Sequence, residues 1–93
     1  MLLDKRTVPM GDRRRLVVRY EDFLCQGEKL ATFTVTVSSG ATSTIDTVSI
    51  SDDETKGFFF VNAADINETF TATVQAVLNT TEVVTDTISF TTV

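Results

Sequence analysis

Hydrophobic and polar residues alternate most regularly in the stretch from Phe70 to Leu78. Its apolar residues fall on every second position, so they share one face of an extended chain, while threonines and a glutamine share the other face. This pattern predicts a half-buried strand. A second alternating run begins after the turn-like residues Asn79, Thr80 and Thr81, which predicts that the two runs pair as an antiparallel hairpin.

Other parts of the chain show the same period over shorter lengths. The apolar positions change phase within the run that precedes Ser51, which predicts a β-bulge near Asp46. The predicted strands are Arg14–Tyr20, Ala31–Val37, Thr44–Ile50, Phe58–Val61, Phe70–Leu78 and Val83–Val93.

Six or seven short strands with turn signals between them are typical of an all-β sandwich. The chain contains 17 threonines, which suit a pleated surface and are mediocre helix formers. Its 93 residues leave room for one domain with one core. We therefore predict an immunoglobulin-like antiparallel β-sandwich over residues 14–93. Its expected core residues are Phe33, Val35, Val37, Val48, Ile50, Phe70, Val74, Ile88 and Phe90.

Residues 1–13 have no regular period and contain Pro9 and Gly11, both poor inside a regular element. We predict an extended N-terminal arm there, too long to pack wholly on so small a domain and therefore held by a neighbouring copy or another protein. Arginines in and beside this arm can pair bidentately with carboxylates across an interface. The candidate partner-binding residues are Lys5, Arg6, Arg13, Arg14 and Arg15.

The charge is distributed unevenly, because residues 1–29 carry seven basic and five acidic residues and residues 30–93 carry one and eight. The acidic body would repel phosphate, and no aromatic residues are interleaved with the arginines, so we expect no nucleic acid as a partner. No apolar run approaches the roughly 20 residues that span a bilayer, so no membrane is expected either. The first six residues do not resemble a secretory signal, and Sec-type export is not expected.

Residues for catalysis or metal binding are sparse. The chain has no histidine, and its single cysteine, Cys25, has no base to activate it. We therefore expect no enzymatic activity, no cofactor and no metal. Asp52, Asp53 and Glu54 lack the alternating ligands and the internal glycine of a calcium loop, which favours a solvated loop. For Cys25 a buried structural thiol is favoured over an intermolecular disulfide.

Three local features complete the expectations. Phe58–Phe60 suits either a strand covered on both faces or a protein contact, and a core role is favoured. Tyr20, Phe23 and Leu24 have the spacing of one helical turn that would direct all three toward the core. Asp86 interrupts the inward row of the last strand, so it is expected to be flipped outward by a bulge or to accept hydrogen bonds near an edge.

A succession of short motifs resembles a known family. The motifs are Tyr20 with Phe23-Leu24, Gly27 to Ala31, Phe33 to Val37 with Gly40, Asn67 to Val74, and Asp86 with Phe90. Over about residues 20–93 they resemble the small fibre-tail adaptor and related immunoglobulin-like virion proteins of tailed bacteriophages. In that family a short turn precedes a Gly-Asp/Glu-x-Ile/Leu-Ala step, and the chain closes with a Thr-rich strand and a final Asp-bearing strand.

The resemblance implies a non-enzymatic virion protein, made in the cytoplasm of a bacterial host. Its expected partners are other virion proteins, as tail, fibre or capsid subunits, and copies of itself. The favoured role is an adaptor that joins tail fibres or spikes to the tail. A capsid decoration (cement) protein is the alternative, and a carbohydrate- or receptor-binding module is less favoured, because the chain has no tryptophan and only one tyrosine as a stacking platform.

Overall fold

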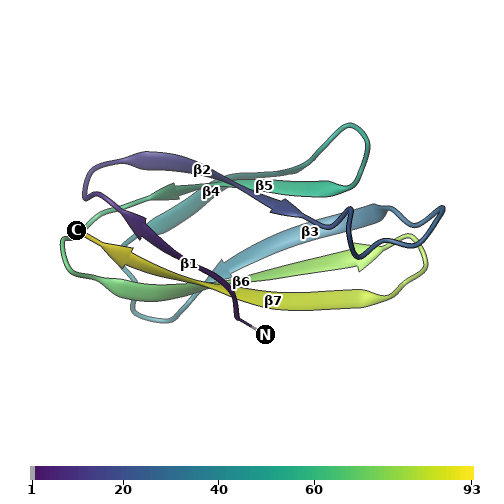
Figure 1. Cartoon of the computed structure of the whole chain (residues 1–93). Coiled ribbons are helices and arrows are strands. Elements are labelled where there is room, and N and C mark those ends of the chain that lie inside the picture. Colours follow the sequence, from purple (N-terminus) through teal and green to yellow (C-terminus); the bar gives the residue numbers. More distant parts are fainter. Residues whose placement is uncertain (1) are drawn as a thin grey trace.

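The computed structural model describes residues 2–93, with side chains from Lys5 onward, and its regular elements are seven strands. The strands are β1 (Leu2–Val8), β2 (Arg13–Arg19), β3 (Leu30–Val37), β4 (Thr44–Ile50), β5 (Lys56–Asn62), β6 (Thr69–Leu78) and β7 (Val83–Thr92). They form two sheets that pack face to face in an elongated body of about 43 by 23 by 19 Å (Figure 1). The predicted all-β class and its two-layer arrangement are confirmed.

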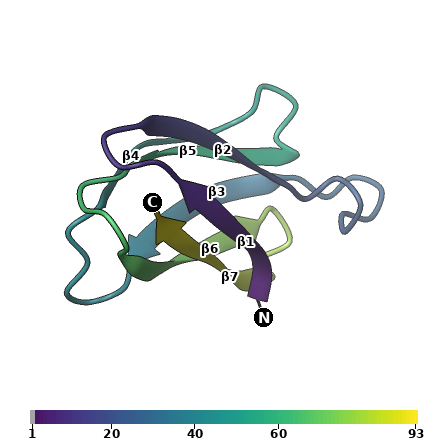
Figure 2. The same cartoon turned by 60° about the vertical axis from the view of Figure 1, so that its left-hand side comes forward.

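The larger sheet has the strand order β1-β7-β6-β3, and the smaller sheet has the order β2-β5-β4. The hairpin predicted from alternation is β6–β7, which pairs antiparallel from Thr69 opposite Thr91 to Val77 opposite Val83. β3 pairs antiparallel with the other side of β6. Figure 2 shows that the consecutive strands β1 and β2 lie in different layers.

The N-terminal segment differs from its prediction as an extended arm that is held by a neighbouring copy or another protein. Residues Leu2–Val8 form β1, which pairs with β7 in parallel from Leu2 opposite Thr87 to Val8 opposite Thr92. The sandwich therefore includes one parallel pair, and the boundary predicted between residues 13 and 14 falls at the start of β2. The pattern concealed this strand because its inward row, opposite Phe90 and Thr92, holds Arg6 as well as Val8, so no apolar alternation marks it.

Inward-facing side chains from both sheets meet in one core. Phe70 and Phe90 stack with their ring centroids 5.2 Å apart. Phe33 meets the ring of Tyr20 edge-on at 6.1 Å and lies 6.5 Å from that of Phe59. The predicted core residues that are fully buried are Phe33, Phe70, Val74, Ile88 and Phe90.

The prediction of Val48 as a core residue is wrong, since its side chain is 40% exposed. The predicted β-bulge is present, because the pairing of β4 with β5 shifts register between Asp46 and Ser49. Thr47, at the bulge, has a left-handed backbone with φ of 53°. The bulge breaks the alternation, so Val48 no longer follows the inward row. The remaining predicted core residues, Val35, Val37 and Ile50, are partly buried against the core.

A second register shift changes which residue of β3 is inward at its start. It lies between Leu30 and Thr32, so Leu30 is buried and Ala31 is exposed. Gly57, the second residue of β5, lies against the ring of Phe33. A Cβ added there would lie 2.6 Å from the ring of Phe33, so only glycine leaves room for that ring.

The expectation for Asp86 also needs correction. The register of β6 with β7 is unbroken at Asp86, so this residue stays in the inward row opposite Val74 and is only 7% exposed. No hydrogen bond to its carboxylate is found among the described side chains, from Lys5 onward. Burial raises the pKa of Tyr20 to about 12, and the negative charge of Asp86 adds to this effect.

The turn predicted after β2 is present, since the amides of Phe23 and Leu24 both donate to the carbonyl of Tyr20 at 2.8 and 3.1 Å. Only two of its three apolar residues serve the core. Tyr20 is buried and Leu24 packs on the core, but Phe23 is 62% exposed because the turn directs it outward. The expectation that all three point inward is therefore wrong.

Candidate functional site

The β1–β2 side of the sandwich is the place where edge strands of the two layers stand apart. β1 and β2 are joined by a short turn in which the Met10 amide bonds the Val93 carbonyl at 2.9 Å and the Gly11 amide bonds that of Ala63 at 2.9 Å. Gly11 has a φ of 84°, which a glycine adopts without strain. On the opposite side, β3 and β4 lie against each other, whereas β1 and β2 do not approach as closely.

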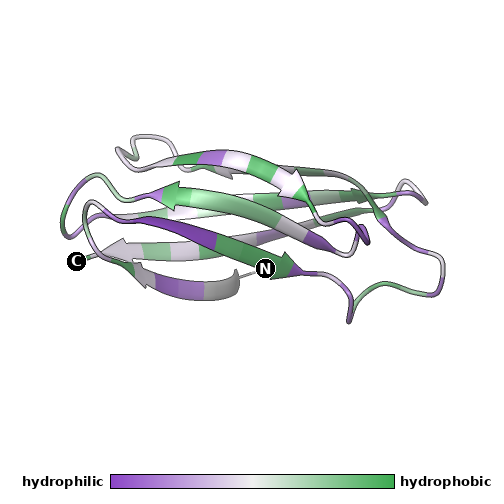
Figure 3. Ribbon diagram, turned by 90° about the horizontal axis from the view of Figure 1, so that it is seen from above, coloured by the Kyte–Doolittle hydropathy of each residue, from purple (hydrophilic) through white to green (hydrophobic). Residues whose placement is uncertain are grey.

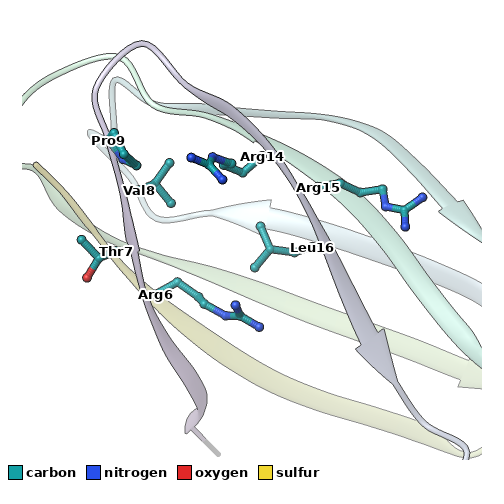
Figure 4. Close-up of a pocket in the computed structure, with 7 residues that line it drawn as sticks. All are labelled: Arg6, Thr7, Val8, Pro9, Arg14, Arg15 and Leu16. Atoms are coloured by element: carbon teal, nitrogen blue, oxygen red, sulfur yellow. The ribbon is translucent and has the colours of Figure 1, made fainter.

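A cleft of about 400 Å³ runs between β1 and β2 (Figure 4). Its floor is apolar, because Val8 and Leu16 are both buried core residues. Its lining residues are Arg6, Thr7, Val8, Pro9, Arg14, Arg15 and Leu16. The cleft therefore combines an apolar floor with cationic walls.

Strand register decides how the five predicted partner-binding residues are divided. Arg6 pairs with the buried Phe90, and Arg14 with the buried Val61, so both lie in inward rows on either side of the cleft. Figure 4 shows Arg6 and Arg14 extending from the two strands that flank it. Lys5 pairs with Ser89 and faces the outside of the larger sheet.

Arg13 and Arg15 face the outside of the smaller sheet. The guanidinium carbon of Arg13 lies 3.8 Å from the ring centroid of Phe60, and that of Arg15 lies 5.2 Å from the centroid of Phe58. Both distances fit cation–π contacts. The structure thus brings Arg6 and Arg14 together at the cleft, and places Arg13 and Arg15 on a different surface.

Arg13 and Arg14 each form a close ion pair with a carboxylate of the same chain. Arg14 donates to one carboxylate oxygen of Asp12 through both Nε and Nη2, at 2.9 and 2.7 Å. Arg13 reaches across β5 and donates to Asp46 on β4 at 2.7 Å. Hydrogen bonds from Asn62, then from Arg13 and Thr47, lower the pKa of Asp46 to about 2.

The core role favoured from sequence for Phe58–Phe60 is wrong for Phe58 and Phe60. Phe59 is fully buried, whereas Phe58 and Phe60 point outward and are half-buried beneath the arginines. The run Phe58–Phe60 therefore serves the core with one residue and the outer face with two. The alternation in Arg13–Arg19 would have suggested an outward arginine row, but only the register of β2 with β5 shows that this row meets the phenylalanines.

The acidic loop Ser51–Thr55 is organised by its own hydrogen bonds. Asp53 accepts hydrogen bonds from the hydroxyl groups of Ser51 and Thr55 at 2.7 and 2.8 Å, and these lower its pKa. Within residues 5–93, whose side chains the structure describes, no group of three or more acidic or thiol side chains has a geometry that could hold a metal ion. No described helix is both long and apolar enough to cross a membrane.

Cys25 is exposed, so the prediction of a buried structural thiol is wrong. It lies in the loop between β2 and β3, where its amide donates to the carboxylate of Glu28. A side-chain hydrogen bond to Glu28 and the charge of that carboxylate raise the pKa of the Cys25 thiol. A smaller thiolate fraction makes this cysteine less nucleophilic than an ordinary exposed one.

Comparison with known proteins found no family model that matches the chain and no curated protein that is significantly similar in sequence.

Proposed function

We propose that this chain is a non-enzymatic virion structural protein of a tailed bacteriophage, an adaptor that joins tail fibres or spikes to the tail. Its partners are other virion proteins and copies of itself, with no nucleic acid or membrane among them, and it acts within the virion. The resemblance of residues 20–93 to fibre-tail adaptors motivates this role.

The observation that carries the proposal is the cationic, open β1–β2 side. All five cationic residues singled out in the sequence lie on β1 and β2, and around them the smaller sheet presents arginine over phenylalanine. Arginine and aromatic residues are enriched where proteins bind one another. A docking role for this side therefore explains the uneven charge of the chain.

An immunoglobulin-like topology is part of the proposal. The order β2-β5-β4 corresponds to strands B, E and D of an immunoglobulin domain, and β7-β6-β3 corresponds to G, F and C. β1 comes first in the chain, as strand A does, but it pairs with the last strand, β7, and not with β2. Both the sheet composition and the chain order support this assignment.

A capsid decoration protein is the second candidate, because a cationic side suits an acidic capsid surface equally well. The carbohydrate-binding alternative is disfavoured by the same contacts that support docking. Sugars stack on open aromatic faces, and the outward rings of Phe58 and Phe60 lie beneath guanidinium groups.

The test is the abundance of the protein in purified phage particles, measured by quantitative mass spectrometry. Arg15→Glu reverses a charge on the outer face of β2, at the rim of the cleft, and Lys29→Glu makes the same change in an exposed residue before β3. We expect both variants to fold, and Arg15→Glu to be depleted from particles by about tenfold or more, which corresponds to about 1.4 kcal/mol of lost binding.

Equal incorporation of the two variants would contradict docking through the β1–β2 side. Absence of the natural protein from particles would contradict the virion role. Recovery with tail and fibre fragments after particle disruption supports the adaptor, whereas recovery with empty capsid shells would assign the protein to decoration.

A further inference from the structure

The free edge of β2 is the most regular of the four sheet edges. The pairing of β1 shifts register between Leu2 and Asp4, that of β3 between Leu30 and Thr32, and that of β4 at the bulge after Asp46. β2, by contrast, pairs with β5 along all of Arg13–Arg19 without a shift. Bulges at an edge strand disturb further pairing, and this edge has none.

The hydrogen bonds at both ends of β2 show which of its main-chain groups are free. The Ala63 amide donates to the Asp12 carbonyl at 3.0 Å, and the Tyr20 amide donates to the Thr55 carbonyl at 3.0 Å. In an antiparallel pair such bonds recur at every second residue, so the even-numbered residues of β2 face β5. The amides and carbonyls that face away from β5 belong to Arg13, Arg15, Val17 and Arg19.

The space beside this edge is not filled by another strand. β1 belongs to the other sheet, and the smaller sheet has three strands against four. The cleft between β1 and β2 offers room for side chains that point inward from an added strand, above the apolar floor formed by Val8 and Leu16. Figure 3 shows β2 as hydrophilic over its first residues and hydrophobic further along.

The charge of β2 selects the kind of strand that can pair there. β2 contains four arginines and no acidic residue. Arg13 and Arg14 are already engaged by Asp46 and Asp12. Among the described side chains, from Lys5 onward, Arg15 makes no ion pair, and Arg19 has Glu21 only at 3.8 Å. Two copies of β2 would repel each other, whereas an acidic segment would be attracted.

We propose that the free edge of β2 receives an extended acidic segment of a partner protein, which adds as the fourth strand of the smaller sheet. The inference rests on the proposed docking function and names its chemistry. Main-chain bonds to the odd-numbered residues of β2 hold the segment in place. Its outward side chains are acidic and meet Arg15 and Arg19, while its inward side chains are apolar and enter the cleft.

The test uses the full chain and a capped nine-residue peptide that alternates valine and glutamate. Amide hydrogen exchange, followed by NMR, measures protection at each residue of β2. Strand addition should slow exchange at the amides of Arg15 and Val17 by about tenfold or more at saturating peptide, while Leu16, already bonded to β5, should change little.

Three matched controls separate main-chain pairing from charge attraction. A peptide with lysine in place of glutamate should not bind, because β2 is cationic. N-methyl groups on alternate amides of the valine–glutamate peptide keep its charge but prevent one of its two edges from donating hydrogen bonds. When the methylated edge is the one that would face β2, the peptide should give no protection. Arg15→Glu with Arg19→Glu should weaken binding of the unmodified peptide about tenfold or more.

Absence of peptide binding, or binding that leaves the exchange of Arg15 and Val17 unchanged, would overturn strand addition. Equal binding of the methylated and unmodified peptides would overturn it as well. Such a result would leave the docking function standing if Arg15→Glu still prevented incorporation into particles. Protection at Arg15 and Val17 without any effect of Arg15→Glu on incorporation would instead support strand addition and contradict the proposed function.

Discussion

The two sides of the sandwich, where an edge of one sheet faces an edge of the other, are built in different ways. On the β3–β4 side the strands lie against each other, and both have a register shift. Their combined sequence contains one charged residue, Asp46. On the β1–β2 side a cleft of about 400 Å³ separates the strands, and cations gather along them.

The comparison indicates that the edge strands on the β3–β4 side contribute to stability, whereas the edge of β2 stays accessible to a partner. A side closed by packing and interrupted by bulges offers little to a partner. A side with a regular edge, an apolar floor and exposed charged side chains is stabilised less by its own contacts and is free to form others. Each prediction below tests one side of this comparison, from the largest expected effect to the smallest.

Deletion of residues 1–8 removes β1 from the β1–β2 side. We expect the truncated chain to lose most of the roughly 5–15 kcal/mol that stabilises a domain of this kind, because β7 becomes an edge and the buried Val8 is lost. Urea denaturation followed by circular dichroism measures the effect. Serine at Lys5 and Arg6 is the control, and it should leave the fold intact. A deletion variant as stable as the full chain would mean that β1 is a dispensable arm.

Phe33→Ala removes the largest side chain that β3 contributes to the core. We expect a loss of about 3–5 kcal/mol, since the ring contacts Tyr20, Phe59 and Gly57. The neighbouring Thr34→Ala, on the exposed face, should change stability by less than about 0.5 kcal/mol. A loss below about 1 kcal/mol for Phe33→Ala would show that this side is not closed by packing.

Gly57→Ala tests the same contact from the other sheet. The added methyl group would lie 2.6 Å from the ring of Phe33, so we expect a loss of about 1–3 kcal/mol through overpacking. Phe33→Leu in the same chain should recover part of this loss, because leucine vacates the space of the ring. Additive effects of the two substitutions in urea denaturation would contradict direct contact.

Glu68 ties the loop between β3 and β4 to the start of β6. It accepts hydrogen bonds from the amide and hydroxyl of Thr42 at 2.8 and 2.7 Å, and from the hydroxyl of Ser43 at 2.6 Å. These bonds, with those from Ser43 first in effect, lower the pKa of Glu68 from 4.5 to about 2. Because the pKa is lower in the folded state, this stabilisation is complete above pH 4.5 and is lost as the pH falls toward 2.

We therefore expect Glu68→Gln to lower the urea midpoint at pH 7 and to make it less sensitive to pH between 4.5 and 2. The measurement is a series of urea titrations across that range for both proteins. Glu82→Gln, the same substitution at an exposed residue in the turn between β6 and β7, is the control for a general change in charge. Parallel pH dependences of the natural chain and Glu68→Gln would contradict the role of this carboxylate.

Arg13 and Phe60 give the smallest effect, on the outer face beside the β1–β2 side. The contact at 3.8 Å predicts a coupling free energy of about 0.5–1 kcal/mol in a double-mutant cycle of Arg13→Ser and Phe60→Leu. Arg15 and Phe58, at 5.2 Å, should couple more weakly. A coupling for Arg13 above about 2 kcal/mol would mean that the arginines on this side hold the fold together.

A strand was predictable from sequence where its apolar residues mark one face. Every inward residue of β6 is apolar and buried, so its alternation is strict and its bounds were predicted to within one residue. β4 was predicted exactly, together with its bulge, although the bulge's effect on Val48 was not. β1 was missed because its inward row holds Arg6 as well as Val8, so no apolar alternation marks it.

The candidate site was predicted in part. The five candidate cations were chosen by charge, which does not give strand register. The sequence therefore could not show that Arg6 and Arg14 lie at the cleft while Arg13 and Arg15 lie on the outer face. The phenylalanines beneath the outer arginines lie more than 40 residues away in the chain. No local sequence pattern connects residues at such a separation, because they become neighbours only when β2 pairs with β5 in the folded chain.

The sequence by itself determined the all-β class, the β6–β7 hairpin and the aromatic core, because side-chain period and burial are local consequences of residue type. Tertiary structure alone decided that the first strand joins the sheet of the last, and that β2 is left with a regular free edge. Every residue except proline carries the same backbone donor and acceptor, so these groups do not specify which strand becomes the neighbour. That choice depends on how the whole set of strands packs.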